Sequence, residues 1–84
     1  QELDSKLQVY PNPTHGIVNI GLDLEQTTEA NINVINSLGQ VVFNDVQSTD
    51  GEISLDLSNL ATGIYTLQVE VEGSIATEMI SLVK

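Results

Sequence analysis

Residues 57–69, Leu-Ser-Asn-Leu-Ala-Thr-Gly-Ile-Tyr-Thr-Leu-Gln-Val, combine a tight turn with the start of an alternating strand. From Tyr65 through Val71, apolar residues alternate with polar ones, which places one set of side chains in a core and the other in water. Gly63 lies where a chain leaving a tight turn often needs a positive φ or lacks room for a Cβ. Tyr65 brings a hydroxyl that needs a partner, so it is either the tyrosine corner of an immunoglobulin-like sandwich or an ordinary half-buried tyrosine.

Six further segments have the composition of short strands, with apolar residues alternating or clustering between turn-forming residues. We expect these strands near residues 7–10, 18–24, 30–35, 40–44, 53–57 and 75–83. Pro11 confines the first of them to a sheet edge, and Gly21 suggests a bulge or a close backbone approach in the second. With no helical periodicity and turn signals every 8–12 residues or so, the sequence predicts an all-β fold, an immunoglobulin-like antiparallel β-sandwich of about seven strands.

Further turns are predicted between these strands. Residues 25–28 form a polar turn, residues 36–39 have the composition of a type I turn with a bulge, residues 47–51 form another turn, and Glu72-Gly73 or Gly73-Ser74 closes a tight hairpin. The last strand carries apolar residues on both faces. It therefore either occupies the centre of a sheet or has an outer face that a partner covers.

The composition limits the kind of partner. Two basic residues, Lys6 and Lys84, stand against twelve carboxylates and give a formal net charge of -10. Nucleic acid is excluded as a partner, because phosphate is bound by clustered Lys and Arg and this chain has no such cluster. No apolar run is long enough to span a bilayer.

A chain of 84 residues forms one domain with a single modest core. The polar residues 1–6 are expected to be a linker from a preceding cargo domain, and residues 7–84 the domain itself.

No motif for catalysis or metal binding is found. His15 lies alone in a proline-rich turn, which indicates a solvated residue, and the chain has no Cys. Aligning Asp50-Gly51 with an EF-hand loop would place Val46 and Leu57 at ligand positions, so it is a turn signal. A Ser, His and Asp triad has no nucleophile elbow to support it. We therefore expect no enzyme activity, catalytic residue, metal site, cofactor or small-molecule substrate.

Three motifs occur in a fixed order: Tyr10-Pro11-Asn12-Pro13-Thr14-His15-Gly16, Asn36-Ser37-Leu38-Gly39-Gln40 and Gly63-Ile64-Tyr65. Together they resemble the C-terminal sorting domain of the type IX (Por) secretion system of Bacteroidetes, in its type A form. The matching positions are Pro11, Asn12, Pro13, Gly16, Gly39, Gly63 and Tyr65. Two features depart from the family pattern: Asn36 and Gln40 replace an acidic and a basic residue, and the end of the chain is poor in lysine.

The resemblance implies a non-catalytic signal that directs an attached cargo across the outer membrane. Its implied partners are outer-membrane translocon or shuttle components, a sortase-like peptidase that removes the domain, and the N-terminal cargo. Its implied location is the periplasm in transit, then the cell surface or the medium. The last strand is implied to face the translocon, through Met79, Ile80, Ser81, Leu82, Val83 and Lys84, and edge-strand pairing with a partner is possible.

A second hypothesis is a structural or adhesive sandwich module of an extracellular protein that binds glycan, calcium or protein. The absence of Trp and of an acidic loop with ligand spacing counts against it. A calcium-dependent rise in Tm favours the adhesive module, whereas export of an attached reporter favours the sorting signal.

Overall fold

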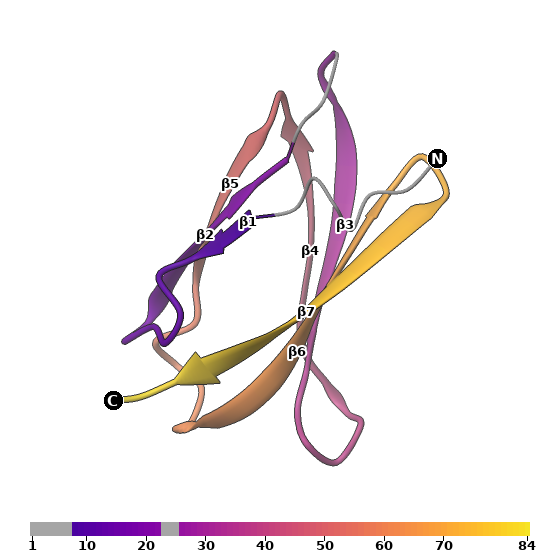
Figure 1. The fold of residues 1–84 in the computed structure, drawn as a ribbon. Coiled ribbons are helices and arrows are strands. Elements are labelled where there is room, and N and C mark those ends of the chain that lie inside the picture. The colour runs from indigo at the N-terminus through magenta and orange to yellow at the C-terminus, as the bar shows by residue number, and fades with distance from the viewer. Residues whose placement is uncertain (1–7, 23–25) are drawn as a thin grey trace.

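The computed structural model describes residues 8–22 and 26–84, which form seven strands (Figure 1). The strands are β1 (Gln8–Tyr10), β2 (Ile17–Gly21), β3 (Thr28–Ile35), β4 (Val41–Thr49), β5 (Glu52–Asp56), β6 (Gly63–Val71) and β7 (Ser74–Leu82). In this part of the chain no helix is long and apolar enough to cross a membrane. The expected linker at residues 1–6 and the predicted strand position Leu24 lie outside the described residues.

The strands form two antiparallel sheets, with the orders β1-β2-β5 and β4-β3-β6-β7. Figure 1 shows the smaller sheet, with β2 and β5, facing the larger sheet, in which β3 and β6 are central. This arrangement confirms the predicted sandwich of seven strands. Among the described strands β1 pairs with β2 alone, and it ends at Tyr10, so it is the edge strand predicted from Pro11.

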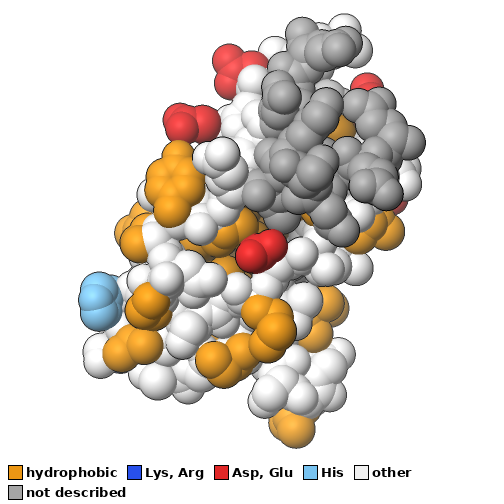
Figure 2. Space-filling model, in the orientation of Figure 1, with side chains coloured by type: hydrophobic (Ala, Val, Ile, Leu, Met, Phe, Trp, Pro, Cys, Tyr) orange, Lys and Arg blue, Asp and Glu red, His pale blue; other side chains and the backbone are white. Residues whose placement is uncertain are grey.

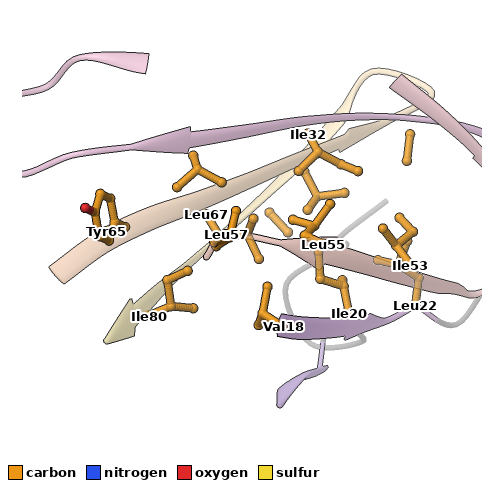
Figure 3. Close-up of a cluster of buried hydrophobic side chains, with 14 of the residues drawn as sticks. Val18, Ile20, Leu22, Ile32, Ile53, Leu55, Leu57, Tyr65, Leu67 and Ile80 are labelled. Atoms are coloured by element: carbon orange, nitrogen blue, oxygen red, sulfur yellow. The ribbon is translucent and has the colours of Figure 1, made fainter. Parts of the chain in front are cut away.

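The alternating residues build one core between the sheets. Val18 and Ile20 of β2 and Leu55 of β5 face Leu67 of β6 and Ile32 of β3 (Figure 3), and each is at most 2% exposed. Burial of these aliphatic side chains supplies most of the stabilisation available to a domain of this size. The strand assignments made from period-two alternation are therefore confirmed at the centre of both sheets.

One predicted strand limit was wrong, and one of the two alternatives for the last strand is excluded. β4 continues through Thr49, whereas the sequence predicted a strand over residues 40–44 and a turn over residues 47–51. Asp45 and Gln47 occupy inward-facing positions opposite Ile32 and Ala30, and these polar residues concealed the alternation. β7 is an edge strand, so the central position considered for it does not apply.

Two glycines differ from expectation. The register of β2 is unbroken at Gly21, so there is no bulge, and the nearest atoms to a Cβ there belong to the side chains of Gln8 and Tyr10. Gly63 has no positive φ, and a Cβ there would lie 3.8 Å from the Tyr65 ring, an ordinary van der Waals distance.

The tight hairpin is confirmed at Glu72-Gly73, where both residues have positive φ, 52° and 83°.

Candidate functional site

Residues 11–16, here called the crossover loop, connect β1 to β2 of the smaller sheet and on the way cross to the edge of β7 in the larger sheet. Thr14 forms an isolated parallel bridge with Leu82. Its N–H donates to Ser81 O at 2.8 Å, and its carbonyl accepts from the N–H of Val83 at 2.8 Å. The loop therefore pairs with the free edge of β7 near its end.

Asn12 extends this pairing with its side chain. Its amide nitrogen donates to Met79 O at 3.0 Å, and its amide oxygen accepts from Ser81 N–H at 3.1 Å. The side chain thus makes the donor and acceptor contacts that a neighbouring strand would make. The flanking bonds Tyr10-Pro11 and Asn12-Pro13 are both cis.

Three further hydrogen bonds hold the chain beyond Leu82. The Nδ1 atom of His15 lies 2.7 Å from Val83 O, and because a carbonyl can only accept, the ring donates. The N–H of Lys84 donates to Thr62 Oγ1 at 3.2 Å, and its Nζ donates to Ser58 O. His15 is exposed, as expected for a turn residue, but its ring also has a defined protein partner.

Thr14 is fully buried, and its side chain shapes the loop. Its hydroxyl donates to Ile17 O and accepts from Gly16 N–H at 3.2 Å. A Cβ at Gly16 would lie 3.3 Å from Ser58 Cβ, closer than ordinary van der Waals contact. Gly16 therefore allows the loop to approach the turn that follows β5.

The same arrangement recurs at the start of β5. Thr49 Oγ1 donates to Glu52 O at 2.7 Å and accepts from Gly51 N–H at 3.1 Å. Gly16 O accepts from Leu57 N–H and Gly51 O accepts from Leu22 N–H, both at 2.7 Å. The antiparallel pair β2 and β5 is thus closed at each end by a Thr-x-Gly turn. Sequence reasoning missed Thr14, although this shared pattern, Thr14-His15-Gly16 and Thr49-Asp50-Gly51, was present as a signal.

The third motif flanks the end of β7 from the other side. In the β6–β7 register, Gly63 lies opposite Leu82 and Tyr65 opposite Ile80. The Tyr65 hydroxyl donates to Ala61 O at 2.6 Å, four residues upstream, and the residue is 7% exposed. This contact is the tyrosine corner that the sequence left as one of two alternatives. The last residues of β7 are therefore held between the first and third motifs.

The second motif forms the β3–β4 turn. Gly39 N–H donates to Asn36 O at 3.0 Å, and Gly39 has a φ of 85°, which confirms the predicted turn with a bulge. Asn36 Nδ2 donates to Gln40 Oε1 at 3.0 Å, so a neutral amide pair spans the turn. Figure 1 shows this turn at the end of the molecule where β7 ends and β6 begins. The structure does not bring Gly39 to the crossover loop.

An open depression of about 450 Å³ lies beside the loop, lined in part by His15, Asp56 and Ser58. The Ser58 hydroxyl donates to Asp56 Oδ1 at 2.6 Å, while the His15 ring is bonded to Val83 O. The three side chains thus lack the Ser–His–Asp order of a nucleophilic triad.

The hydroxyl of Ser58, then its N–H, and the charge of Lys84 lower the pKa of Asp56, which stays ionised. Among the described residues no group of His, Asp and Glu could hold a metal ion.

The structure divides the six end-strand residues into two sets. Ile80 and Leu82 point into the core and are at most 1% exposed. Met79 is 64% exposed and Val83 40% exposed, while Ser81 is half-buried and Lys84 is exposed. A folded domain can therefore offer a partner the side chains at 79, 83 and 84, but not those at 80 and 82.

Comparison with known proteins adds an independent finding. The family model described as "Secretion system C-terminal sorting domain" matches residues 8–83. Among curated proteins, none matches the chain closely enough to count as a relative. Domains of this family are non-catalytic C-terminal sorting signals for type IX secretion, which implies contact with that machinery, an N-terminal cargo, and export to the cell surface or the medium. Nothing in the match supports an adhesive module. Because the match runs from the first strand through the last, the chain belongs to the family of secretion system C-terminal sorting domains.

Proposed function

We propose that outer-membrane translocon or shuttle components of type IX secretion recognise this domain at the end of β7. The cargo reaches them from the periplasm, with residues 7–84 as the sorting domain, and a sortase-like peptidase then cuts within the polar residues 1–6. The domain itself performs no catalysis and binds no small-molecule substrate.

One observation carries this proposal: the end of β7 is fixed on both edges by the motifs that mark the family. Asn12 and Thr14 hold its outer edge, and the residues from Gly63 to Tyr65 pair with its inner edge. In this proposal the motif positions Pro11, Asn12, Pro13, Gly16, Gly39, Gly63 and Tyr65 shape the recognised surface. Tyr65 acts as a core anchor and does not contact the partner.

A row of mostly apolar, uncharged side chains lies beside this end. Met79, Thr66 and Ile35 lie in one cross-strand row, Val41 lies opposite Ile35, and Ile64 lies next to Thr66 along β6. Met79, Val41 and Ile64 are between 48% and 64% exposed. Figure 2 shows hydrophobic side chains over the half of the molecule where β7 ends. A protein that buries such a row gains the transfer free energy of its side chains, which suits a recognition surface.

The test is an export assay with a periplasmic reporter fused ahead of residues 1–84, in a host that has type IX secretion. The wild-type fusion is expected at the surface or in the medium. Removing residues 80–84 is expected to abolish export, but it also removes the core residues Ile80 and Leu82, so a point variant is needed. Met79→Asp places a charge on the proposed surface without touching the core.

The matched control is Val46→Asp, on the other edge strand of the same sheet, where the side chain is 53% exposed. Both variants are expected to keep the Tm of the wild type, and only Met79→Asp is expected to stay inside the cell. Normal export of a folded Met79→Asp fusion contradicts the proposed surface. Failure of the wild-type fusion to leave the cell contradicts the proposed function as a whole.

A further inference from the structure

The crossover loop covers only part of the outer edge of β7. Met79, Ser81 and Val83 turn backbone groups away from β6, and these groups bond to Asn12, Thr14 and His15. Because β7 keeps an unbroken register with β6, the same alternation turns the N–H and carbonyl of Thr77 and Ile75 outward. Within residues 8–22 and 26–84, no hydrogen bond joins these groups to another segment on that edge.

The opposite edge of the larger sheet is protected by its own residues. Asp45 occupies an inward-facing position of β4, and its carboxylate accepts from Val46 N–H at 3.0 Å and from Gln47 Nε2 at 2.9 Å. A strand added there would have to bury a carboxylate that is already bonded, a known protection of edge strands. The edge strands of the smaller sheet are short, with three residues in β1 and five in β5.

Glu78, in the open stretch of β7, differs from Asp45 of β4 in that its carboxylate has no partner among the described residues. It lies opposite Leu67, in the inward-facing alternation with Ala76 and Ile80, yet it is exposed. Unlike Asp45, it makes no hydrogen bond or ion pair within the described part of the chain. A strand added here would bring its own side chain against Glu78. A Lys or Arg at that position would gain a charge-assisted hydrogen bond, whereas an Asp or Glu would be repelled.

We propose that β7 between Ile75 and Glu78 is a pairing edge for an extended segment of a partner protein that carries Lys or Arg opposite Glu78. The backbone groups of Ile75 and Thr77 bond to the segment, and the exposed side chains of Ile75 and Met79 pack against its apolar residues. A second copy of this chain is a poor occupant, because each copy has a net charge of -10. The inference rests on the proposed function, since it assigns the partner to the export machinery.

The test uses the same reporter fusion. Thr77→Pro removes the outward N–H without removing a bond to β6, and an edge strand tolerates proline at such a position. Ser48→Pro is the matched control, because the alternation along β4 turns the Ser48 N–H away from β3 as well. Thr77→Pro is expected to lower export at least ~10-fold with little change in Tm, while Ser48→Pro exports like the wild type.

Charge is tested with Glu78→Lys and Glu78→Gln, which change an exposed side chain and leave folding intact. Export is expected to fall at least ~10-fold for Glu78→Lys and less for Glu78→Gln. If the wild type is exported and both Thr77→Pro and Glu78→Lys are exported equally well, the pairing edge is overturned and the proposed function stands. If Thr77→Pro does not fold, Glu78→Lys alone decides in the same way.

Two other occupants give distinct results. A wild-type domain that sediments as a dimer, and becomes a monomer in Thr77→Pro, assigns the edge to a second copy and overturns the partner proposal. A Tm loss in Thr77→Pro that disappears when residues 1–6 are deleted assigns the edge to the chain's own first residues, and this result overturns it as well.

Discussion

The backbone N–H of Ser81 donates to the side-chain oxygen of Asn12 at 3.1 Å, across 69 positions of the sequence. The side-chain nitrogen of Asn12 donates to Met79 O, so this one side chain spans the stretch of β7 that includes Ile80. An edge strand with occupied donors and acceptors cannot slide or fray as easily as a free one. The shape of the sorting signal at this end is therefore fixed before any partner arrives.

Replacing Asn12 with Ala should loosen the end of β7. The loss of both hydrogen bonds is expected to lower the free energy of unfolding by about 1–2 kcal/mol and to speed exchange of the Ser81 amide. Asn12→Asp keeps the acceptor but loses the donor to Met79 O, so an intermediate effect is expected. Hydrogen exchange measured by NMR checks both variants, with exposed Asn59→Ala as the control. Unchanged Ser81 exchange in Asn12→Ala contradicts the assignment.

The two Thr-x-Gly turns provide an internally matched pair. Thr14→Val and Thr49→Val each remove a buried hydroxyl with two partners, so each is expected to cost about 1–3 kcal/mol in urea unfolding. Only Thr14→Val should also speed amide exchange at Val83, because only Thr14 pairs with β7. Equal effects of both variants at Val83 would show that the crossover loop has no special role in holding this end.

Removing only the hydroxyl of Tyr65 should show how much the tyrosine corner contributes to the free energy of unfolding. Tyr65→Phe leaves Ala61 O without its donor and is expected to lower the free energy of unfolding by about 1–2 kcal/mol. Tyr10→Phe, which removes an exposed bond to Glu52, should cost less than about 0.5 kcal/mol. Urea denaturation of both variants gives the comparison. Similar costs for the two would argue against a structural role of the Tyr65 hydroxyl.

Two glycines of the family motifs should respond differently to alanine. Gly39 has a φ of 85°, so Gly39→Ala is expected to cost about 1–2 kcal/mol although no atom crowds the position. Gly63 has neither a positive φ nor a close neighbour, so Gly63→Ala should change stability by less than about 0.5 kcal/mol. Thermal unfolding distinguishes them. If Gly63→Ala keeps its stability but loses export, Gly63 matters for recognition and not for folding.

Protonation of Asp56 should account for part of the stability that the domain loses at low pH. Its pKa in the folded protein is held below the ordinary value of 3.8, so its contribution to stability is present above that pH and is lost as the pH falls through the folded pKa. Ser58→Ala removes the largest cause of the shift, and the pKa of Asp56 should rise toward 3.8. Lys84→Gln should raise it less, because the Lys84 charge is a smaller cause. A carboxyl titration by NMR checks the order, and an unchanged pKa in Ser58→Ala contradicts it.

The sequence predicted those features that arise from local patterns. Alternation identified the core strands, and Asn36 to Gly39 identified a specific turn, because both depend on residues within a few positions of each other. The length of β4 was missed because Asp45 and Gln47 are inward-facing at an edge, where half-burial tolerates polar side chains.

The candidate site was harder to predict, because its contacts join distant segments through backbone atoms. Family resemblance selected Asn12, but nothing local indicates that its amide bonds to Met79 and Ser81, or that Thr14 is fully buried. Apolar residues on both faces left two alternatives for the last strand, a central position or an outer face that a partner covers. The topology places that strand at an edge, with Ile80 and Leu82 inward and Met79 exposed.

The crossover loop also sets an order of events during synthesis. Asn12 and Thr14 leave the ribosome early, but their partners on β7 are translated more than sixty residues later. Until then the loop lacks its hydrogen bonds to β7, and the sandwich cannot close at this end. A polypeptide whose translation stops before residue 79 therefore lacks the finished surface, so the fold makes the export address available only on chains that have been completed through β7.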